Sequence, residues 1–398
     1  MATFSVRFLG CKVSQTDAQH VRERLLAEGH SELSEGAEVA VVNTCCVTHE
    51  AVSKSRQAVS RAARTHRRVY VTGCGANLEG AFTGAAPNVH VVARRSEDTP
   101  DIVAGDVGAI GCIQADAKLE RVRAFVKVQD GCSFSCRFCV VPLVRGASRS
   151  RPAAAVLGEI GRRVAQGHRE IVLTGINLGC YRDRAAGYRL GELVREAGAV
   201  AGVERLRLSS IEVNHVDRAL VEAIRETPNL AKHLHVPLQS GDDAVLGAMG
   251  RRYTSSTFLK RIAPLADFNV TTDVIVGFPG ESDAAFERTM AIIAEAGITK
   301  VHVFPYSPRP GTATAEADTV PRAVKKERGA RLRAVSHDAC MRLWRGKLGS
   351  EDVVLVDRPS RGYGDDYSPW LVPGETPLGS IVRVRAQAVT EEGIVGVV

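Results

Sequence analysis

Residues 124–139 read AFVKVQDGCSFSCRFC, a short apolar segment followed at once by three cysteines. The segment from Ala124 to Val128 is rich in Val and predicts a β-strand. Cys132, Cys136 and Cys139 follow in the spacing C-x3-C-x2-C, which allows one compact loop to surround an inorganic centre. The stretch therefore predicts a strand that ends in a metal-binding loop.

Three interpretations of this loop stay open from its residues alone. A structural zinc site takes four protein ligands, so it would need a fourth from a distant part of the chain. A 4Fe-4S cluster held by three thiolates leaves one iron open for chemistry. The third interpretation is a set of unrelated buried thiols. Ten cysteines in 398 residues are too few for a disulfide scaffold, and their regular placement favours metal or redox chemistry.

The strand at 124–128 is the first of a series in the middle of the chain. Helical segments separate the strands, for example Ala153 to Ala165 and Ala284 to Glu295. Six consecutive β-α units predict an α/β fold with an incomplete, TIM-like (β/α)6 parallel barrel, whose active site lies at the C-terminal strand ends. The five further strands are expected at Ile171–Thr174, Leu206–Ser209, Leu234–Val236, Thr271–Val276 and Val301–Phe304.

The N-terminal part of the chain also alternates strands and helices. Helices are expected at Thr16–Ala27 and His49–Ala63, which together with the intervening strands predicts a parallel sheet over residues 1–105. Residues 106–120 lose this periodicity and are expected to form a linker. The four expected strands are Ser5–Leu9, Val39–Val42, Val69–Thr72 and Val89–Val92.

A second set of cysteines is scattered through this N-terminal part. Cys11, Cys45 and Cys74 each follow a predicted strand directly. Because parallel strands end at one edge of a sheet, where open α/β folds bind ligands, these three thiols are expected to converge. The alternative is three small apolar residues in a core. The other cysteines are expected to be structural, with Cys46 facing away from its neighbour; they are Cys46, Cys112, Cys180 and Cys340.

The C-terminal part has a different character. Arg322 to Arg345 carries eight Lys or Arg against two acidic residues, and is expected to form a basic helix that connects two domains. Beyond it, Val-rich segments at Asp352–Val356 and Ile381–Ala386 predict a small antiparallel β-barrel over residues 346–398. The barrel domain of the middle series then occupies residues 121–345.

Composition excludes several classes of protein. The chain is 44% apolar and 24% charged, which fits a globular protein and excludes a disordered or collagen-like one. The sequence has no apolar run of about 18 residues and no secretory signal, so we expect a cytoplasmic protein that does not associate with membranes. A net charge of +7 is compatible with a polyanionic partner without demonstrating one.

The two cysteine patterns resemble one known family. C-x3-C-x2-C with an aromatic residue, Phe138, before its last cysteine is similar to the signature of radical S-adenosylmethionine (SAM) enzymes. The scattered N-terminal cysteines narrow the resemblance to the methylthiotransferase branch, and it covers essentially the whole chain. It implies an N-terminal methylthiotransferase domain, a radical SAM domain and a C-terminal TRAM domain. It also implies two 4Fe-4S clusters: Cys132, Cys136 and Cys139 hold the one that cleaves SAM, and Cys11, Cys45 and Cys74 hold an auxiliary cluster that carries sulfur.

The first cysteine motif indicates a subgroup within the family. Residues 10–15 read GCKVSQ and resemble the GCKVNQ of the MtaB type, which acts on N6-threonylcarbamoyladenosine beside the tRNA anticodon; the chain has Ser14 where that pattern has Asn. Two alternatives stay open: the MiaB type, which acts on isopentenyladenosine in tRNA, and the RimO type, which acts on a ribosomal-protein aspartate. From another class, a non-catalytic zinc or iron-sulfur module that binds RNA also remains an alternative.

The resemblance also implies where the cofactor lies. In the family, loops after the barrel strands border SAM, so residues that follow the predicted strands are candidates for its ribose and methionine portions. Glycines in these loops would allow close backbone approach. Together with Phe138, the candidates are Gly175, Asn177, Ser209, Glu212, Gln239 and Gly277.

The expected macromolecular partner is the tRNA anticodon stem-loop. Three basic groups are candidates for phosphate contacts: the helix from Lys54 to Arg68, the cluster Arg145, Arg149 and Arg151, and the basic connector. The C-terminal domain is net negative by three charges, so RNA contact there would depend on Arg358, Arg361, Tyr363 and Tyr367. The resemblance further implies a reducing electron donor such as flavodoxin or ferredoxin and a sulfur source, and we expect a monomer.

Overall fold

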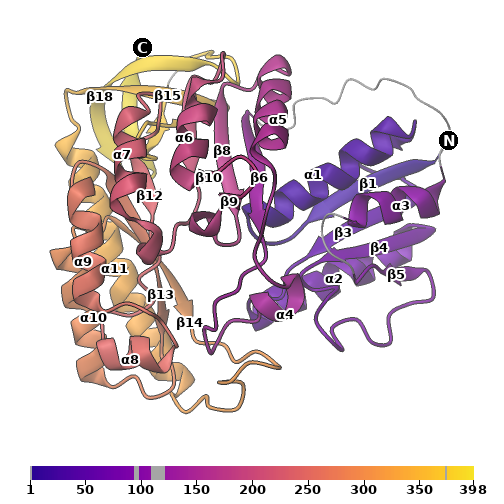
Figure 1. Cartoon of the computed structure of the whole chain (residues 1–398), viewed down its shortest axis with the longest axis horizontal. Helices are drawn as coiled ribbons and strands as arrows, with labels where there is room; N and C mark the ends of the chain where they lie inside the picture. Colours follow the sequence, from indigo (N-terminus) through magenta and orange to yellow (C-terminus); the bar gives the residue numbers. More distant parts are fainter. Residues whose placement is uncertain (1, 94–97, 109–121, 373) are drawn as a thin grey trace. The chain divides into compact units, whose positions relative to one another are not determined.

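The computed structural model describes residues 2–93, 98–108, 122–372 and 374–398 (Figure 1). The chain divides into two units. Unit 1 consists of Met1–Leu119, Asp130–Ser148 and Arg309–Ala315, and unit 2 consists of Glu120–Gln129, Arg149–Pro308 and Glu316–Val398. Most of the linker expected at 106–120 lies outside the described residues, although residues 106 and 107 belong to a helix.

Unit 1 contains the parallel sheet that the sequence predicts. Every neighbouring pair of its strands is parallel, in the order β2-β1-β3-β4-β5 within the described residues. The prediction missed β2, which is only two residues long and leaves no periodic pattern. The strands are β1 (Thr3–Phe8), β2 (Ser31–Glu32), β3 (Val39–Thr44), β4 (Arg68–Gly73) and β5 (Val89–Val91).

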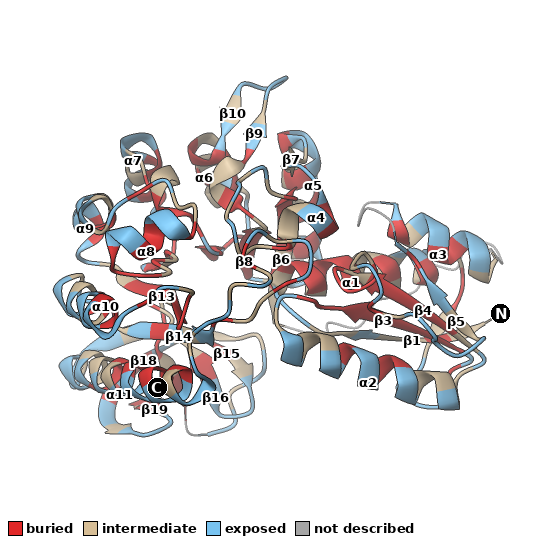
Figure 2. Cartoon of the chain, turned by 90° about the horizontal axis from the view of Figure 1, so that it is seen from below, coloured by how far each residue is buried: buried red, intermediate tan, exposed pale blue. Residues whose placement is uncertain are grey.

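Alternating side chains of this sheet sort onto its two faces. Val39 and Val41 of β3 pack in one core, and Ala40 and Val42 pack in another, as the two-residue period of a strand requires. Helix α1 (Lys12–Ala27) and α3 (Thr99–Val107) contribute to the first core, and α2 (His49–Thr65) contributes to the second. Figure 2 shows α2 with one buried side and one long exposed side.

Unit 2 contains the six parallel strands predicted for the open barrel, within the described residues. β6, β8 and β11 pair in one sheet, which also holds the short β7 (Arg149–Ser150), and β12, β13 and β14 pair in a second. An isolated parallel bridge pairs Leu206 of β11 with Leu230, three residues before β12. The strands are β6 (Arg123–Asp130), β8 (Glu170–Gly175), β11 (Arg205–Leu208), β12 (His233–His235), β13 (Asn269–Val276) and β14 (Lys300–Pro305).

Helices surround these strands and cover one large apolar core. That core takes residues from every barrel strand and from Leu332 of the last helix. A short hairpin, β9 (Arg182–Asp183) and β10 (Tyr188–Arg189), precedes α6. The helices of unit 2 are α5 (Ala153–Ala165), α6 (Leu190–Ala199), α7 (Arg218–Glu226), α8 (Asp243–Ala248), α9 (Ser255–Ile262), α10 (Asp283–Glu295) and α11 (Arg322–Gly346).

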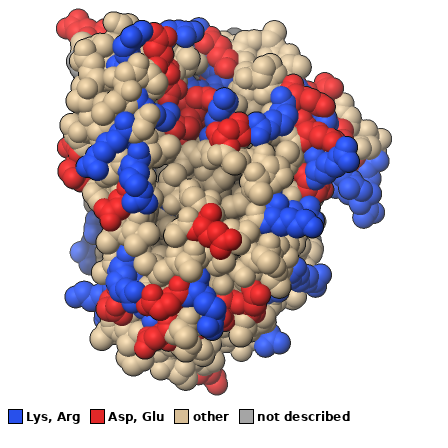
Figure 3. Space-filling view, turned by 90° about the vertical axis from the view of Figure 1, so that its left-hand side faces the viewer, with Lys and Arg blue, Asp and Glu red and all other residues tan. Residues whose placement is uncertain are grey.

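The basic helix α11 is part of the barrel wall, and this differs from the expected connector. Leu332 is fully buried, and the Ser336 hydroxyl accepts a 2.9 Å hydrogen bond from the Val301 amide of β14. Arg331 pairs with Glu287 of α10 at 2.7 Å. The face in Figure 3 accordingly shows basic and acidic side chains interspersed. Three basic residues of this helix, Lys325, Arg328 and Arg331, thus form ion pairs within unit 2.

The C-terminal segment forms a closed five-stranded barrel within the described residues. Trp370 is 1% exposed and lies in its core. β17 and β19 pair in parallel, so the barrel is not wholly antiparallel as predicted; the other four neighbouring pairs are antiparallel. Its strands are β15 (Glu351–Arg358), β16 (Arg361–Tyr363), β17 (Pro369–Leu371), β18 (Ile381–Thr390) and β19 (Gly393–Val397).

The small barrel is attached to the N-terminal ends of the parallel strands. Arg123, which begins β6, donates to the Tyr367 hydroxyl at 3.0 Å and to Asp357 at 2.7 Å. Tyr363 and Tyr367 stack on each other with ring centroids 4.7 Å apart, beneath the Arg123 guanidinium. These two tyrosines therefore help attach the small barrel to β6, and their expected contact with RNA stays a prediction.

No helix in the described part of the chain is long and apolar enough to span a membrane.

Candidate metal centres and strand-end site

The N-terminal cysteines lie at the edge of the unit 1 sheet where the strand order reverses. The order β2-β1-β3-β4-β5 is that of doubly wound folds with a flavodoxin-like arrangement, whose ligands bind beyond the ends of β1 and β3. Cys11 follows β1, Cys45 follows β3 and Cys74 follows β4. The sheet therefore brings the three predicted ligands to one edge, as the sequence indicated.

Cys11 is the N-cap residue of helix α1 and is exposed. Its thiol lies 3.7 Å from the Ser14 hydroxyl, so Ser14, which departs from the subgroup pattern, contacts a predicted ligand. Gly10 has a φ of +125°, and a Cβ atom there would lie 3.1 Å from Cys45 Cβ and 2.9 Å from Ser14 Oγ. A glycine is thus required for this close approach between the first and second cysteine segments.

Cys45 is buried and fixed through its backbone. The Ser55 hydroxyl of α2 accepts from the Cys45 amide and donates to its carbonyl, each at 3.1 Å. Burial, followed by the neighbouring thiols of Cys74 and Cys11, raises the pKa of Cys45 to about 11. The free thiol is therefore protonated at neutral pH, and binding a metal at this position would release its proton.

Cys46 is buried, as expected, but it faces Cys74. The two thiols hydrogen-bond, and this bond together with the Arg145 guanidinium lowers the pKa of Cys74 to about 7 against the effect of burial. The same bond raises the pKa of Cys46. Sequence reasoning placed Cys46 on the far side of an extended chain, but the segment turns after β3, so the two-residue period ends at that point.

Arg145 is a buried cation at this edge. Its Nε donates to Cys74 Sγ at 2.9 Å, its Nη2 donates to Asp17 at 2.8 Å, and its Nη1 donates to Asp130 at 3.0 Å. Its side chain is 5% exposed. The assignment of Arg145 to an RNA-binding cluster is therefore wrong, because every donor group of the guanidinium is directed into the protein.

The loop that carries Cys132, Cys136 and Cys139 also belongs to unit 1. The Cys132 amide donates to the Gly146 carbonyl at 3.0 Å, and the Cys139 amide donates to the Cys136 carbonyl at 3.1 Å. These bonds close the loop at both ends. The three thiols are partly exposed, and so is the ring of Phe138 beside them.

Gly131 is essential to the shape of this loop. It has a φ of +68°, and a Cβ atom there would lie 2.2 Å from the Ala147 carbonyl oxygen. Both the conformation and the space therefore require glycine.

Among the described residues, no three His, Cys, Asp or Glu side chains are arranged to hold a single metal ion. An iron-sulfur cube places each thiolate on a different iron, so its ligands are spaced more widely than those of one ion. At the N-terminal edge, the buried Asn43 carboxamide oxygen has no hydrogen-bond partner in the described part of the chain. Thiols at three strand ends beside an unsatisfied polar atom fit a bound inorganic group.

The predicted SAM residues of unit 2 lie beyond the C-terminal ends of its strands. Asn177 is buried after β8, and its amide donates to the Gln129 carboxamide at 2.8 Å. A Cβ atom at Gly175 would lie 3.0 Å from that same oxygen, so this glycine makes room for Gln129. Ser209 follows β11 and is 5% exposed, yet its hydroxyl has no hydrogen-bond partner among the described residues. A buried unsatisfied hydroxyl is a polar atom suited to a ligand.

Glu212 and Gln239 differ in how the protein uses them. Glu212 caps a short helix by accepting from the Asn214 amide at 3.0 Å and pairs with Arg251 at 3.5 Å. Gln239 has a φ of +66°, which is strained for a residue with a side chain. Its backbone amide donates to the Asp273 carbonyl of β13 at 2.8 Å. Backbone strain of this kind is concentrated at functional sites, so Gln239 remains a candidate for contact with SAM.

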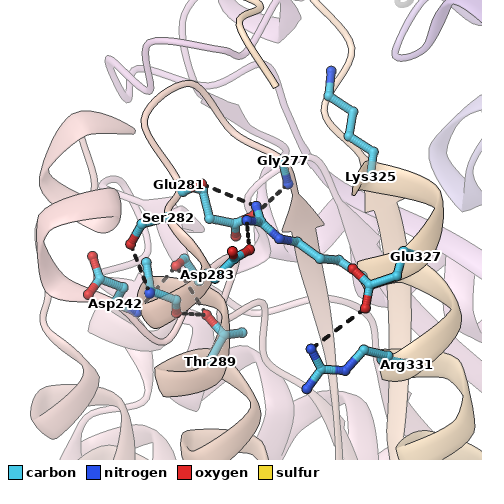
Figure 4. Close-up of polar contacts among 12 residues, drawn as sticks. Asp242, Gly277, Glu281, Ser282, Asp283, Thr289, Lys325, Glu327 and Arg331 are labelled. Carbon is cyan, nitrogen blue, oxygen red and sulfur yellow. Dashed lines mark hydrogen bonds and ion pairs between the residues drawn. The ribbon is translucent and has the colours of Figure 1, made fainter. Parts of the chain in front are cut away.

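Gly277 is held by contacts inside unit 2 (Figure 4). Its amide donates to Glu281 at 2.6 Å, and a Cβ atom there would lie 2.4 Å from Lys325 Cγ. Arg328 pairs with the same carboxylate at 2.6 Å, while burial raises the pKa of Glu281. The glycine is therefore required by packing against α11, whatever else it contacts.

Cys180 and Cys340 belong to unit 2, whereas both triplets belong to unit 1. Cys180 contacts His215 Nε2 at 3.3 Å in unit 2, and the Cys340 thiol donates to the Thr299 carbonyl at 3.1 Å. Cys112 lies outside the described residues.

Comparison with known proteins decides the family. Residues 126–293 match the Radical SAM superfamily, and residues 3–93 match a family described as uncharacterized protein family UPF0004. The threonylcarbamoyladenosine tRNA methylthiotransferase MtaB of Thermotoga maritima is 34% identical, over 99% of this chain and 96% of that protein. The chain belongs to the radical SAM methylthiotransferase family.

Two further relatives of this methylthiotransferase carry different names. MtaB of Bacillus subtilis is 34% identical, over 97% of this chain and 94% of that protein. A tRNA-2-methylthio-N(6)-dimethylallyladenosine synthase of Xanthomonas euvesicatoria is 35% identical, over 94% and 87%. Among solved structures, the radical SAM methyltransferase TsrM of Kitasatospora setae is 12% identical with a TM-score of 0.58, covering 79% of this chain and 75% of that one; this likeness concerns the fold alone.

Membership of the family implies SAM and 4Fe-4S clusters as cofactors. Sequence reasoning proposed the cluster cysteines of this methylthiotransferase but did not identify the residues that contact their segments, namely Asp17, Ser55, Asp130 and Arg145. The only local signal for Arg145 was its charge, which it shares with exposed arginines.

Proposed function

We propose that the chain is a tRNA methylthiotransferase that installs a 2-methylthio group on N6-threonylcarbamoyladenosine beside the anticodon. The observation that carries the proposal is the 34% identity to MtaB over 99% of the chain, and the two cysteine triplets, which resemble those of the family, support it. Bound 4Fe-4S clusters would supply the electron that cleaves SAM and the sulfur that is transferred. The protein's own task is then to hold, orient and shield these groups.

In this proposal the two cysteine triplets have separate roles. Cys132, Cys136 and Cys139 would hold the cluster that binds SAM, in a loop whose backbone is closed by the bonds to Gly146 and within the loop itself. Cys11, Cys45 and Cys74 would hold the auxiliary cluster at the sheet edge. The contacts of Ser14, Ser55 and Arg145 support these three positions, because each fixes a ligand segment before any metal is bound.

The strand ends of unit 2 would orient SAM. Ser209 supports this with a buried hydroxyl that lacks a partner in the described residues, and Asn177 with a buried carboxamide on the neighbouring strand end. Gly175, Glu212, Gln239, Gly277 and Phe138 remain candidates, with Glu212 and Gly277 also serving the fold.

Helix α2 offers the best surface for tRNA phosphates. Lys54, Arg56, Arg61, Arg64 and Arg67 are exposed along and just beyond this helix of unit 1. Arg56 also donates to the Ala81 carbonyl at 2.6 Å, and Lys54 pairs with Glu50 at 2.6 Å. Several exposed cations along and just beyond one helix suit a backbone of regularly spaced phosphates. The proposal also includes a cytoplasmic monomer with domains at residues 1–105, 121–345 and 346–398. Its partners would be an electron donor of the flavodoxin or ferredoxin type and a sulfur source.

The decisive test is nucleoside analysis of tRNA by mass spectrometry. A strain lacking the gene should lose the 2-methylthio derivative of threonylcarbamoyladenosine, and expression of the wild-type chain should restore it. Loss of the dimethylallyladenosine derivative would instead establish the second candidate, which the 35% identical Xanthomonas synthases favour. An unchanged nucleoside profile would contradict both.

The division of labour between the triplets is tested on purified protein. Anaerobically prepared Cys136→Ala should not cleave SAM, whereas Cys45→Ala should cleave SAM without thiolating tRNA. Cys340→Ala is the matched control, because the Cys340 thiol donates to the Thr299 carbonyl and belongs to neither triplet. This variant should keep both activities and its full iron content. Equal loss of cleavage in Cys45→Ala and Cys136→Ala would contradict the assignment.

A further inference from the structure

Arg145 connects the two cysteine sites of unit 1. It ends the short helix α4 (Val141–Arg145), six residues after Cys139, and its side chain is 5% exposed. The guanidinium donates to Cys74 Sγ at 2.9 Å, to Asp17 at 2.8 Å and to both oxygens of Asp130 at 3.0 and 3.2 Å. Cys74 and Asp17 lie far from Arg145 in the sequence, and Asp130 lies at the opposite end of the loop that contains Arg145.

Each partner lies beside a predicted cluster ligand. Cys74 is itself one of the N-terminal triplet. Asp17 lies in α1, the helix that begins immediately after Cys11. Asp130 ends β6 two residues before Cys132, and its carboxylate accepts from the Gly131 amide at 2.7 Å, so it holds the entry of the loop. One side chain thus contacts the supports of both triplets.

Only arginine satisfies this set of partners. The planar guanidinium carries five N–H donors in a fixed fork, so it can bind two carboxylates and a sulfur in different directions at once. The ammonium of lysine is a compact charge on a flexible stem and cannot reproduce that fork. Buried carboxylates such as Asp17 and Asp130 also need a compensating cation, which Arg145 provides.

We propose that Arg145 is a positioning residue that holds Cys74 for the auxiliary cluster and couples that site to the loop of the SAM-binding cluster. The proposal rests on the two-cluster function above. A hydrogen bond to a ligating sulfur stabilises the more reduced, more negative state of an iron-sulfur cluster, so Arg145 raises the reduction potential of the auxiliary cluster. It also slows loss of that cluster, since it fixes one of the ligands.

The test uses Arg145→Lys in the full-length chain, which keeps a positive charge between the two carboxylates. The auxiliary cluster is isolated by adding Cys136→Ala, and its midpoint potential is measured by EPR-monitored redox titration. We expect a more negative potential than in Cys136→Ala alone, and removal of iron by a chelator that is about 10-fold faster. In the converse background, Cys45→Ala, the potential of the remaining cluster should change less.

Arg24→Lys is the matched control, because that arginine of unit 1 pairs with Glu28 and Asp101 and not with a thiol. It should leave both the potential and the rate of iron loss unchanged. If Arg145→Lys does not fold, Asp17→Asn removes one anchor of the guanidinium and keeps the cation; we then expect faster iron loss from the auxiliary site.

Two results separate the inference from the function on which it rests. If wild-type protein forms both clusters and thiolates tRNA while Arg145→Lys matches it in potential and iron loss, the inference is overturned and the function stands. If wild-type protein assembles no iron-sulfur cluster under anaerobic conditions, the proposed function itself fails.

Discussion

The hydroxyl of Ser55 in α2 contacts both the amide nitrogen and the carbonyl oxygen of Cys45, each at 3.1 Å. Ser55 is fully buried, so neither contact is replaced by water when the hydroxyl is lost. We expect Ser55→Ala to lower the free energy of unfolding by roughly 1–3 kcal/mol and to reduce iron at the auxiliary site. Ser60→Ala, at an exposed position of the same helix, should change neither; equal effects of the two would refute the role of Ser55.

Gly131 controls the cysteine loop through its backbone. Gly131→Ala would place a Cβ 2.2 Å from the Ala147 carbonyl oxygen at a φ of +68°, so the loop must change shape. We expect loss of SAM cleavage and of about half the bound iron, measured by iron analysis and 5′-deoxyadenosine release. Gly158→Ala in α5 is the control, since its nearest neighbour would be a flexible Arg162 nitrogen at 3.8 Å, and it should be neutral or slightly stabilising.

Replacing Ser209 should weaken SAM binding without lowering the stability of the fold. Because its buried hydroxyl lacks a partner in the described residues, Ser209→Ala should leave the unfolding free energy unchanged or slightly higher. The dissociation constant for SAM, measured by equilibrium dialysis under anaerobic conditions, should rise roughly 2- to 10-fold. Ser336→Ala should do the opposite, destabilising the fold without affecting SAM, because its hydroxyl accepts from the Val301 amide. Unchanged SAM affinity in Ser209→Ala would remove this residue from the site.

Glu170 should make stability depend on acid pH. Burial would raise its pKa, but Arg207, Arg205 and Arg123 outweigh burial and lower it below the ordinary value of 4.5. The folded state therefore binds fewer protons than the unfolded state near that value, so this stabilisation is full above pH 4.5 and is lost as the pH falls below it.

Replacing Glu170 leaves buried arginines without their partner. We expect Glu170→Gln to lower the unfolding free energy at pH 7 by roughly 3–5 kcal/mol, measured by urea titration. The difference from wild type should shrink as the pH is lowered below 4.5. A difference that stays constant from pH 7 to pH 4 would show that the carboxylate charge is not the cause.

The exposed arginines of α2 should contribute to tRNA affinity through charge. Replacing Arg61, Arg64 and Arg67 together by Ala should weaken binding and reduce the slope of log affinity against log salt by about 2 to 3, measured by filter binding across salt concentrations. Arg218→Ala is the control, because that arginine is 92% exposed but belongs to α7 and pairs with Glu222. An unchanged slope in the triple variant would move the RNA contact elsewhere.

Local patterns explain why so much of the fold could be predicted. The barrel strands and α5 were located because Val-rich segments and helix starts repeat along the chain. Six cysteines were assigned because three follow strands of the N-terminal sheet and three share one C-x3-C-x2-C loop after β6. The two-residue β2 escaped because it has no period. The parallel pairing of β17 with β19 depends on contacts across the barrel, which a pattern along one strand does not carry.

The roles of arginine and tyrosine side chains could not be assigned in this way, because the same side chain can serve either the surface or the interior of a protein. Arg145 was grouped with exposed basic residues because its partner Asp17 lies 128 residues away and Cys74 lies 71 residues away. Tyr363 and Tyr367 were expected on a surface, yet Arg123 packs over both rings. In each case burial and a distant partner, not the residue type, set the role.

The sequence by itself determined the order of elements, the position of both cysteine triplets and the family, because these depend on spacing and periodicity along the chain. Only the tertiary structure decided which polar groups support the triplets. A buried guanidinium or hydroxyl forms hydrogen bonds with the groups that lie close to it, and the packing of strands and helices determines which groups those are. The loop beginning at Asp130 thus appears in the sequence as three regularly spaced cysteines, and in the folded chain as a loop whose first residue is bound by Arg145.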